Sequence, residues 1–261
     1  MSQPPGKCRF CGEPGLTKGH IWPESFGRIL PSDANYHEQK IGSFESFSAA
    51  IPGPEKWERV GTGPLQKRRP RNTCHSCNTG WMSRLEQTTG PMVRPMILGE
   101  QMLLTPIEIC LLASMYALIS MRIELTAHGM RTIPQSEIDF LRLRMLPSEN
   151  WRIWIARHAG DDLKDYKYRY TAMQIESDPS VRFGKEFCNT QVTTLVVGKL
   201  FVHIMFSTAW PEFGRYEGVS LTPLWPHSCP YIDTRWLPPI SDVEGVFLHE
   251  AISRAGNSGR L

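Results

Sequence analysis

The feature that most constrains this 261-residue chain is a pair of Cys-x-x-Cys motifs placed far apart in the sequence. One pair is Cys8 and Cys11, the other is Cys74 and Cys77, and 62 residues separate the two pairs. A two-residue spacer lets both thiolates of a pair reach one metal ion, and two such pairs complete a closed, tetrahedral zinc site. We therefore expect a structural Zn²⁺ that ties two distant segments together and loops out the residues between them.

The other cysteines and the apolar pattern indicate a globular chain kept in a reducing compartment. The chain has seven cysteines, an odd number, and the three outside the pairs stand alone. Because the first residues lack the apolar run of a signal sequence, we expect free thiols in a cytoplasmic protein. The most apolar stretch, 109–121, is too short to cross a bilayer, so we predict a buried helix and no membrane partner.

The charge of the chain is unevenly distributed between two regions. Residues 1–90 contain 12 lysines and arginines against 8 acidic residues, whereas residues 91–261 contain 17 against 18. The whole positive excess lies in the cysteine-rich part, as expected for a module that binds a polyanion such as nucleic acid.

The two regions also differ in their hydrophobic pattern, which predicts an α+β protein made of two domains. Residues 1–90 are rich in Gly, Pro and Ser with little periodicity, which indicates a small module that does not fold on apolar burial alone. Residues 91–261 are predicted to form an α+β domain that serves in sensing, targeting or oligomerisation. Its expected elements are helices over 105–127, 134–145 and 242–254, strands over 151–156, 166–175, 191–197 and 200–208, and a loop over 223–239.

The residues beside the cysteine pairs resemble a nuclease motif. Lys18-Gly-His-Ile-Trp-Pro-Glu follows the first pair, and Asn78 directly follows the second. Over residues 8–86 this combination is similar to the HNH endonuclease superfamily, the ββα-metal nucleases, in its variants with a zinc-binding Cys-x-x-Cys pair on each side of the site. In that family a His-hydrophobic-hydrophobic-Pro motif ends the first strand, and Cys-x-x-Cys-Asn or Cys-x-x-Cys-His opens the helix.

The resemblance implies chemical roles for two residues. His20 matches the position of the general base, and an imidazole that titrates near neutrality suits the activation of water. Asn78 matches the helix-borne metal ligand, and its amide oxygen suits a hard cation such as Mg²⁺ or Mn²⁺. The zinc ion would hold the strand and helix in register without joining the reaction.

Three positions depart from the family pattern or are left open by it. Many members have an acidic metal ligand immediately before the catalytic histidine, where this chain has Gly19. The middle asparagine of the motif has one nearby candidate, Asn72, whose register the sequence does not fix. Glu86 lies eight residues beyond Asn78 on a similar helix face, about 12 Å away by helical rise. Glu86 is expected either to serve the site from a distance or to be a solvated or salt-bridged glutamate.

A basic run just before Cys74 completes the predicted site, and its cations are Lys67, Arg68, Arg69 and Arg71. Such a run is often only a solvated loop, but its place beside the nuclease motif favours contacts with backbone phosphates. His75, between two cysteines, is expected to be a surface imidazole, with replacement of a zinc ligand as the alternative.

These features lead to a metal-dependent endonuclease, a phosphodiester hydrolase whose partner is DNA rather than RNA, as the leading hypothesis. A role in bacterial anti-phage defence is suggested by analogy alone. Two alternatives stay open: a zinc-stabilised nucleic-acid-binding or regulatory protein with a decayed HNH site, and an RNA-cleaving HNH nuclease. A homo-oligomer formed through residues 91–261 is also left open.

Overall fold

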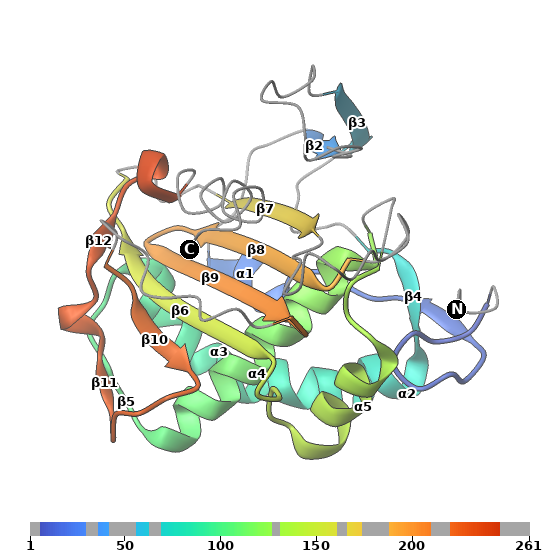
Figure 1. Cartoon of the computed structure of the whole chain (residues 1–261), viewed down its shortest axis with the longest axis horizontal. Helices are drawn as coiled ribbons and strands as arrows, with labels where there is room; N and C mark the ends of the chain where they lie inside the picture. The colour runs from blue at the N-terminus through green and yellow to red at the C-terminus, as the bar shows by residue number, and fades with distance from the viewer. Residues whose placement is uncertain are drawn as a thin grey trace, which may run out of the picture.

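The computed structural model of the chain describes residues 6–29, 36–41, 56–62, 69–126, 131–160, 166–173, 188–209 and 220–245. Helices and strands are mixed, as the α+β prediction requires, and the largest sheet lies against a layer of helices (Figure 1). The helices are α1 (Glu24–Ile29), α2 (His75–Cys77), α3 (Ser83–Leu98), α4 (Pro106–Glu124) and α5 (Gln135–Arg144), with a π-helical turn over Asn78–Met82.

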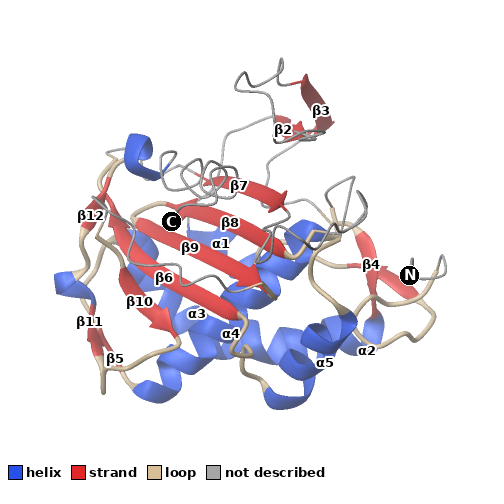
Figure 2. Ribbon diagram, viewed as in Figure 1, coloured by secondary structure: helices blue, strands red, loops and turns tan. Residues whose placement is uncertain are grey.

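The main sheet has the strand order β10-β6-β9-β8-β7, in which neighbouring strands are antiparallel (Figure 2). The short strand β12 pairs with β6 in parallel. The strands of this sheet are β6 (Trp151–His158), β7 (Tyr166–Met173), β8 (Thr190–Val197), β9 (Leu200–Ser207), β10 (Thr222–Trp225) and β12 (Pro239–Ile240). The strands predicted over 191–197 and 200–208 are confirmed as β8 and β9, which pair as a hairpin across a turn in which Gly198 has φ +56°. A side chain at that backbone conformation would be strained, which explains the glycine.

The central helix α4 follows from its sequence. Thr105 caps it, its side chain accepts from the backbone N–H of Glu108, and Pro106 occupies the first turn. Among the described residues α4 alone is long and apolar enough to cross a bilayer, yet most of it is buried against the sheet and its neighbouring helices. The prediction of a buried helix over 109–121 is therefore confirmed.

The segment predicted as a loop over 223–239 contains regular structure, so that prediction is wrong in part. Besides β10 and β12 it holds β11 (Ile232–Asp233), paired with β5 (Leu103–Leu104), and a 3-10 turn over Thr234–Trp236. These strands are too short to show alternation in the sequence, and their pairing partners lie far away along the chain. Of the helix predicted over 242–254, only residues 242–245 lie within the described part, and they are helical.

The cysteine-rich part forms a small strand–strand–helix unit. Its strands β1 (Leu16–Lys18) and β4 (Arg71–Cys74) are antiparallel, and the chain then runs through α2 and the π-helical turn into α3. A second antiparallel pair, β2 (Tyr36–Ile41) and β3 (Lys56–Thr62), belongs to the insertion between β1 and β4.

Among the described residues, the two regions share one hydrophobic core. The division expected at residue 90 falls inside α3, which continues through Pro91 and Pro95. Buried side chains of the cysteine-rich part, among them Ile21, Trp22 and Phe26, belong to the same hydrophobic cluster as those of α4 and the sheet. Trp22 also meets Tyr168 of β7 edge-on, with ring centroids 6.3 Å apart. The segment that carries His20 is thus anchored on the main sheet.

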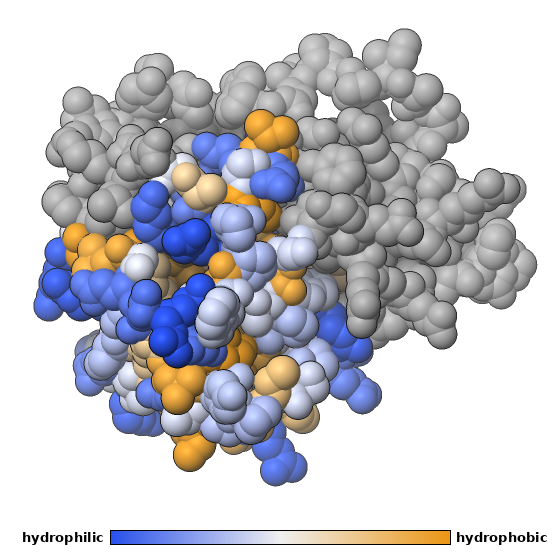
Figure 3. Space-filling view, turned by 90° about the vertical axis from the view of Figure 1, so that its left-hand side faces the viewer, coloured by the Kyte–Doolittle hydropathy of each residue, from blue (hydrophilic) through white to orange (hydrophobic). Residues whose placement is uncertain are grey.

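The face that carries β10, β11 and β12 is shown in Figure 3. Among its described residues, hydrophobic side chains are dispersed between hydrophilic ones. Single exposed apolar side chains of this kind are ordinary on a folded surface.

Candidate functional site

The four paired cysteines come together, as the sequence predicts. Their sulfur atoms all lie within 4.8 Å of one another, and those of Cys11 and Cys74 are 3.5 Å apart. Cys8 and Cys11 sit in a tight turn, in which the N–H of Gly12 donates to the carbonyl of Cys8 at 2.8 Å and Gly12 has φ +80°. Cys74 ends β4 and Cys77 ends α2.

The donor set fits a single tetrahedral metal ion. Zinc–sulfur bonds of about 2.3 Å place the sulfur atoms of a tetrahedron about 3.8 Å apart, close to the spacing seen here. Burial raises the pKa of Cys77, and contact with the Cys11 thiol raises it further. At Cys74 burial also acts to raise the pKa, but hydrogen bonds from Ser76 and from the backbone of Cys77 outweigh it and lower the pKa to about 6. Packed thiols that compete for protons in this way are a natural site for a cation that takes their place.

The strand pair beside this cluster presents His20. Beyond the end of β1 the N–H of Gly19 donates to the carbonyl of Pro70 at 3.1 Å, so the two segments stay together up to His20. Immediately after it, Ile21 and Trp22 are fully buried. The His-hydrophobic-hydrophobic-Pro pattern therefore anchors its two apolar residues in the core and leaves the half-buried imidazole at the edge.

The environment of His20 favours its neutral form. Burial lowers the pKa of the imidazole below its ordinary value, and the nearby positive charge of Arg69 lowers it further. The carboxylates of Glu24 and Glu86 act in the opposite direction with smaller effects. A neutral imidazole is the form that can accept a proton from water.

Arg69 makes direct contact with His20. Its Nε donates a hydrogen bond to Nε2 of the imidazole at 2.5 Å. The sequence placed Arg69 in a basic run without linking it to the histidine, since 49 positions separate them. Arg71 is exposed and lies opposite Lys18 in the β1–β4 pair, while Lys67 and Arg68 lie outside the described residues.

Asn78 begins the π-helical turn and points toward the segment that carries His20. A side-chain carbon placed on Gly19 would lie 3.2 Å from the amide oxygen of Asn78 and 3.7 Å from the hydroxyl oxygen of Thr73. The fold therefore brings the backbone next to His20 close to the side chain of Asn78. An acidic side chain at position 19 would crowd the amide of Asn78.

Within the turn, Gly80 leaves helical geometry at φ −88° and ψ −112°. Irregular turns of this kind re-aim the side chains around them and occur often at functional sites.

Asn72 is the extra residue of a β-bulge. Thr17 pairs with Thr73 and Lys18 with Arg71, so Asn72 has no partner of its own in β1. Its carbonyl accepts from the N–H of Arg9 at 3.0 Å, and its amide oxygen accepts from the hydroxyl of Thr73 at 3.0 Å. Asn72 thus joins β4 to the turn that holds Cys8 and Cys11.

Glu86 forms an ion pair with a partner that the sequence did not identify. Nη1 of Arg122, from α4, lies 2.5 Å from its carboxylate oxygen, and the side chain of Arg122 is only 4% exposed. Nη2 of Arg122 also reaches the sulfur of Met82 at 3.4 Å. Of the two roles expected for Glu86, the structure shows the salt-bridged one, with its partner in the interior. The one sequence signal was a lone arginine near the end of an apolar helix, where an unpaired charge is costly.

Arg9 makes a second link between the regions. From the turn between Cys8 and Cys11, it donates to the carboxamide oxygen of Gln135 at 2.9 Å and to the carbonyl of Ile133 at 3.1 Å. Trp81 packs on the same turn, edge-on to Phe10 with ring centroids 6.0 Å apart, and Met82 is fully buried. His75 is exposed, and the metal-suited group around it consists of the four cysteines.

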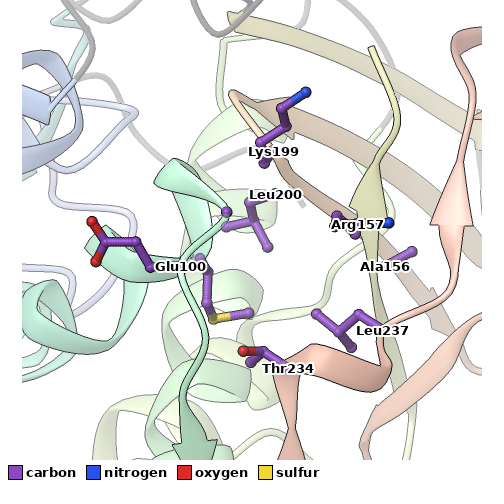
Figure 4. Close-up of a pocket in the computed structure, with 9 residues that line it drawn as sticks. Glu100, Ala156, Arg157, Lys199, Leu200, Thr234 and Leu237 are labelled. Atoms are coloured by element: carbon purple, nitrogen blue, oxygen red, sulfur yellow. The ribbon is translucent and has the colours of Figure 1, made fainter. Parts of the chain in front are cut away.

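A small cavity elsewhere has the wrong size and place for a substrate. It lies where the end of α3 meets β6 and the β8–β9 turn, and Glu100, Arg157, Lys199 and Leu237 are among the residues that line it (Figure 4). Its volume of about 20 Å³ holds roughly one water molecule.

No protein-family model, curated protein or solved structure matches the chain in the three comparisons. The case for a function therefore rests on the residues and their geometry.

Proposed function

We propose that the chain is a metal-dependent endonuclease of the HNH type that hydrolyses phosphodiester bonds of DNA. The observation that carries the proposal is the approach of Gly19 and Asn78, which are 59 positions apart in the sequence. Gly19, next to His20, lies against the amide oxygen of Asn78 at the start of the helical segment. A strand–strand–helix unit in which the residue before the histidine meets the amide oxygen of the helical segment supports the arrangement that the sequence resemblance implies.

In this proposal the four cysteines hold a structural Zn²⁺. A closed site of four thiolates leaves no open position for substrate, so its role is to fix the geometry around it. Because Cys74 ends β4 and Cys77 lies one residue before Asn78, the ion fixes the strand and the start of the helical segment at once.

The chain's own residues supply the base and orient it. His20, held neutral by burial and by Arg69, accepts a proton from the attacking water. Ile21 and Trp22 fix its backbone by burial, so the imidazole needs little reorganisation. Asn78 would hold a Mg²⁺ or Mn²⁺ ion through its amide oxygen, with the Thr73 hydroxyl nearby. Such an ion neutralises the charge that develops on the leaving oxygen.

Substrate binding is assigned to the basic run. Arg69 and Arg71 are exposed beside the site, and arginine recognises phosphate through paired N–H donors. With Lys67 and Arg68 they would bind the backbone on either side of the cut, independently of base sequence. Residues 91–261 would then serve in sensing or targeting, and a part in anti-phage defence remains an analogy.

One observation favours a second function, that of a zinc-stabilised nucleic-acid-binding protein with a decayed site. Within the described residues, the four cysteines are the only group of three or more His, Cys, Asp or Glu side chains suited to a metal ion. The catalytic ion would thus depend on Asn78, water and phosphate for most of its ligands. Mg²⁺ commonly binds with several waters and substrate phosphates, so this donor set still fits.

Plasmid cleavage separates the two functions. Purified protein with its metal content measured is incubated with supercoiled DNA, and with single-stranded RNA in parallel, in Mg²⁺ or Mn²⁺. The proposal predicts nicked or linear DNA that depends on the added ion. Binding of DNA without cleavage under any divalent ion would support the decayed-site function, and cleavage of RNA alone would change the substrate.

A further inference from the structure

The hydrogen bond between Arg69 and His20 occupies the atom that a general base needs. Arg69 Nε is the donor and His20 Nε2 is the acceptor. An imidazole that accepts at Nε2 carries its proton on Nδ1, so Nε2 holds its only available lone pair. In the free protein this lone pair is engaged, and His20 cannot take a proton from water through it.

The position of Arg69 is set by the backbone and leaves its side chain at the surface. The bond from Gly19 N–H to the carbonyl of Pro70 joins the two segments, so Arg69 lies across from His20. The nearest acids that act on His20 have other partners: Glu24 accepts from Arg28 at 3.3 Å, and Glu86 from Arg122. The guanidinium is exposed and donates to a neutral ring nitrogen.

We propose that Arg69 is a latch on His20 that a phosphate group releases. The latch rests on the proposed nuclease function, because the phosphate is that of the bound nucleic acid. A phosphate accepts two parallel N–H bonds from a guanidinium and carries the opposite charge, whereas His20 Nε2 accepts one bond and is neutral, so a phosphate beside the site draws the guanidinium away. One hydrogen bond replaces another, no covalent bond changes, and the Nε2 lone pair becomes free.

The latch makes Arg69 different from Arg71, although both belong to the same basic run. Arg69 binds the phosphate and frees the base in one movement, and it is therefore a positioning residue. Arg71, opposite Lys18 in the strand pair, has no such connection to the imidazole. The Nε2 lone pair of His20 is thus free to accept a proton only when substrate is bound.

Carbethoxylation of histidine by diethyl pyrocarbonate reports directly on the free lone pair and does not depend on cleavage. The rate is followed residue by residue by peptide mass mapping at pH 8, where His20 is neutral whether or not Arg69 is present. Exposed His75 in the same module is the internal reference. We expect Arg69→Gln to raise the rate at His20 relative to His75 by about tenfold, the factor that corresponds to one charged hydrogen bond. Arg71→Gln is the matched control and should leave the ratio unchanged.

Inorganic phosphate tests the release. Compared with chloride at equal ionic strength, it should speed the modification of His20 in the wild-type protein and have no effect on Arg69→Gln. The latch is overturned if Arg69→Gln equals the wild type, if Arg71→Gln has the same effect, or if phosphate leaves the wild-type ratio unchanged. Wild-type protein that cleaves no nucleic acid but still responds to phosphate would remove the proposed function and leave the latch in place. Cleavage without a phosphate response would do the reverse.

Discussion

The strands beside the cysteine cluster and those of the main sheet differ in length and in burial. β1 and β4 have three and four residues, and only Thr73 and Cys74 among them are buried. β8 and β9 have eight residues each, and every one is buried. A two-stranded ribbon as short as β1–β4 is marginal in water, whereas long paired strands packed on a helix are stable by themselves.

The two regions are therefore held in place by different means. The sheet and α4 bury a continuous apolar core. The strand–strand–helix unit relies on its cysteine cluster and on its attachment to that core through Trp22, Arg9 and the Glu86–Arg122 pair. The proposed chemistry therefore lies in the region whose geometry depends on the metal site and on its contacts with the core.

Removal of one cysteine should have the largest effect and should separate the two regions most clearly. In Cys74→Ser we expect loss of the bound metal and melting of the unit around His20, because the binding energy of a structural metal is folding energy. Far-ultraviolet circular dichroism should still show the helices and sheet of the remainder. The checks are zinc content by elemental analysis and thermal unfolding.

Cys229→Ser is the matched control, since Cys229 is exposed and stands outside the cluster. It should keep about one zinc ion per chain. Less than half a zinc ion per chain in folded wild-type protein, or full metal content in Cys74→Ser, would contradict the account.

The ion pair between the regions should have the next largest effect. Glu86→Ala leaves the guanidinium of Arg122 buried without its carboxylate, which typically costs about 3–5 kcal/mol of unfolding free energy. Glu86→Ala combined with Arg122→Met should be less destabilised than Glu86→Ala alone, because the buried charge is gone. Denaturant unfolding of both variants measures the difference.

The exposed pair of Glu24 and Arg28 gives the control, because a surface pair of this kind is worth less than about 1 kcal/mol. Glu24→Gln should therefore unfold nearly as the wild type does. A Glu86→Ala variant as stable as Glu24→Gln would show that the two regions do not depend on this contact.

The pH dependence of cleavage should show the smallest effect. Because burial and Arg69 lower the pKa of His20, the base stays unprotonated below pH 6.5 and activity is lost only as the pH falls through the lowered pKa. The acid limb of kcat/KM should therefore lie below pH 6.5. In Arg69→Gln, which removes one of the causes that lower the pKa of His20, the limb should move to higher pH, while Arg71→Gln should leave it in place. A wild-type limb above pH 6.5 would exclude this environment for the base.

The sequence predicted those features that depend on local spacing. The spacing within each cysteine pair, the start of α4 near Thr105 and the strands β8 and β9 each follow from residues a few positions apart, and the meeting of the two pairs follows from the four ligands that zinc takes. The bond from Arg69 to His20 and the pair of Arg122 with Glu86 could not be predicted, because each joins segments that only the complete fold brings together. The resemblance predicted a helix that begins near Asn78 and includes Glu86, but the sequence did not predict that α3 continues past residue 90. Pro91 and Pro95 argue against a helix locally, but burial of Met92, Val93 and Met96 stabilises it.

We propose that His20 acts as the base in a unit that the cysteine cluster holds in place. The decisive measurement is single-turnover cleavage of supercoiled plasmid by His20→Ala, with His75→Ala as the matched control. His20→Ala should keep its zinc content and thermal stability while the rate falls by roughly 10²–10⁴, the usual contribution of positioned proton transfer. No concentration of Mg²⁺ or Mn²⁺ should restore it, whereas raised metal should partly restore Asn78→Ala, which loses a ligand and not a base. Full activity in His20→Ala, or loss of activity in His75→Ala with zinc retained, would contradict the account.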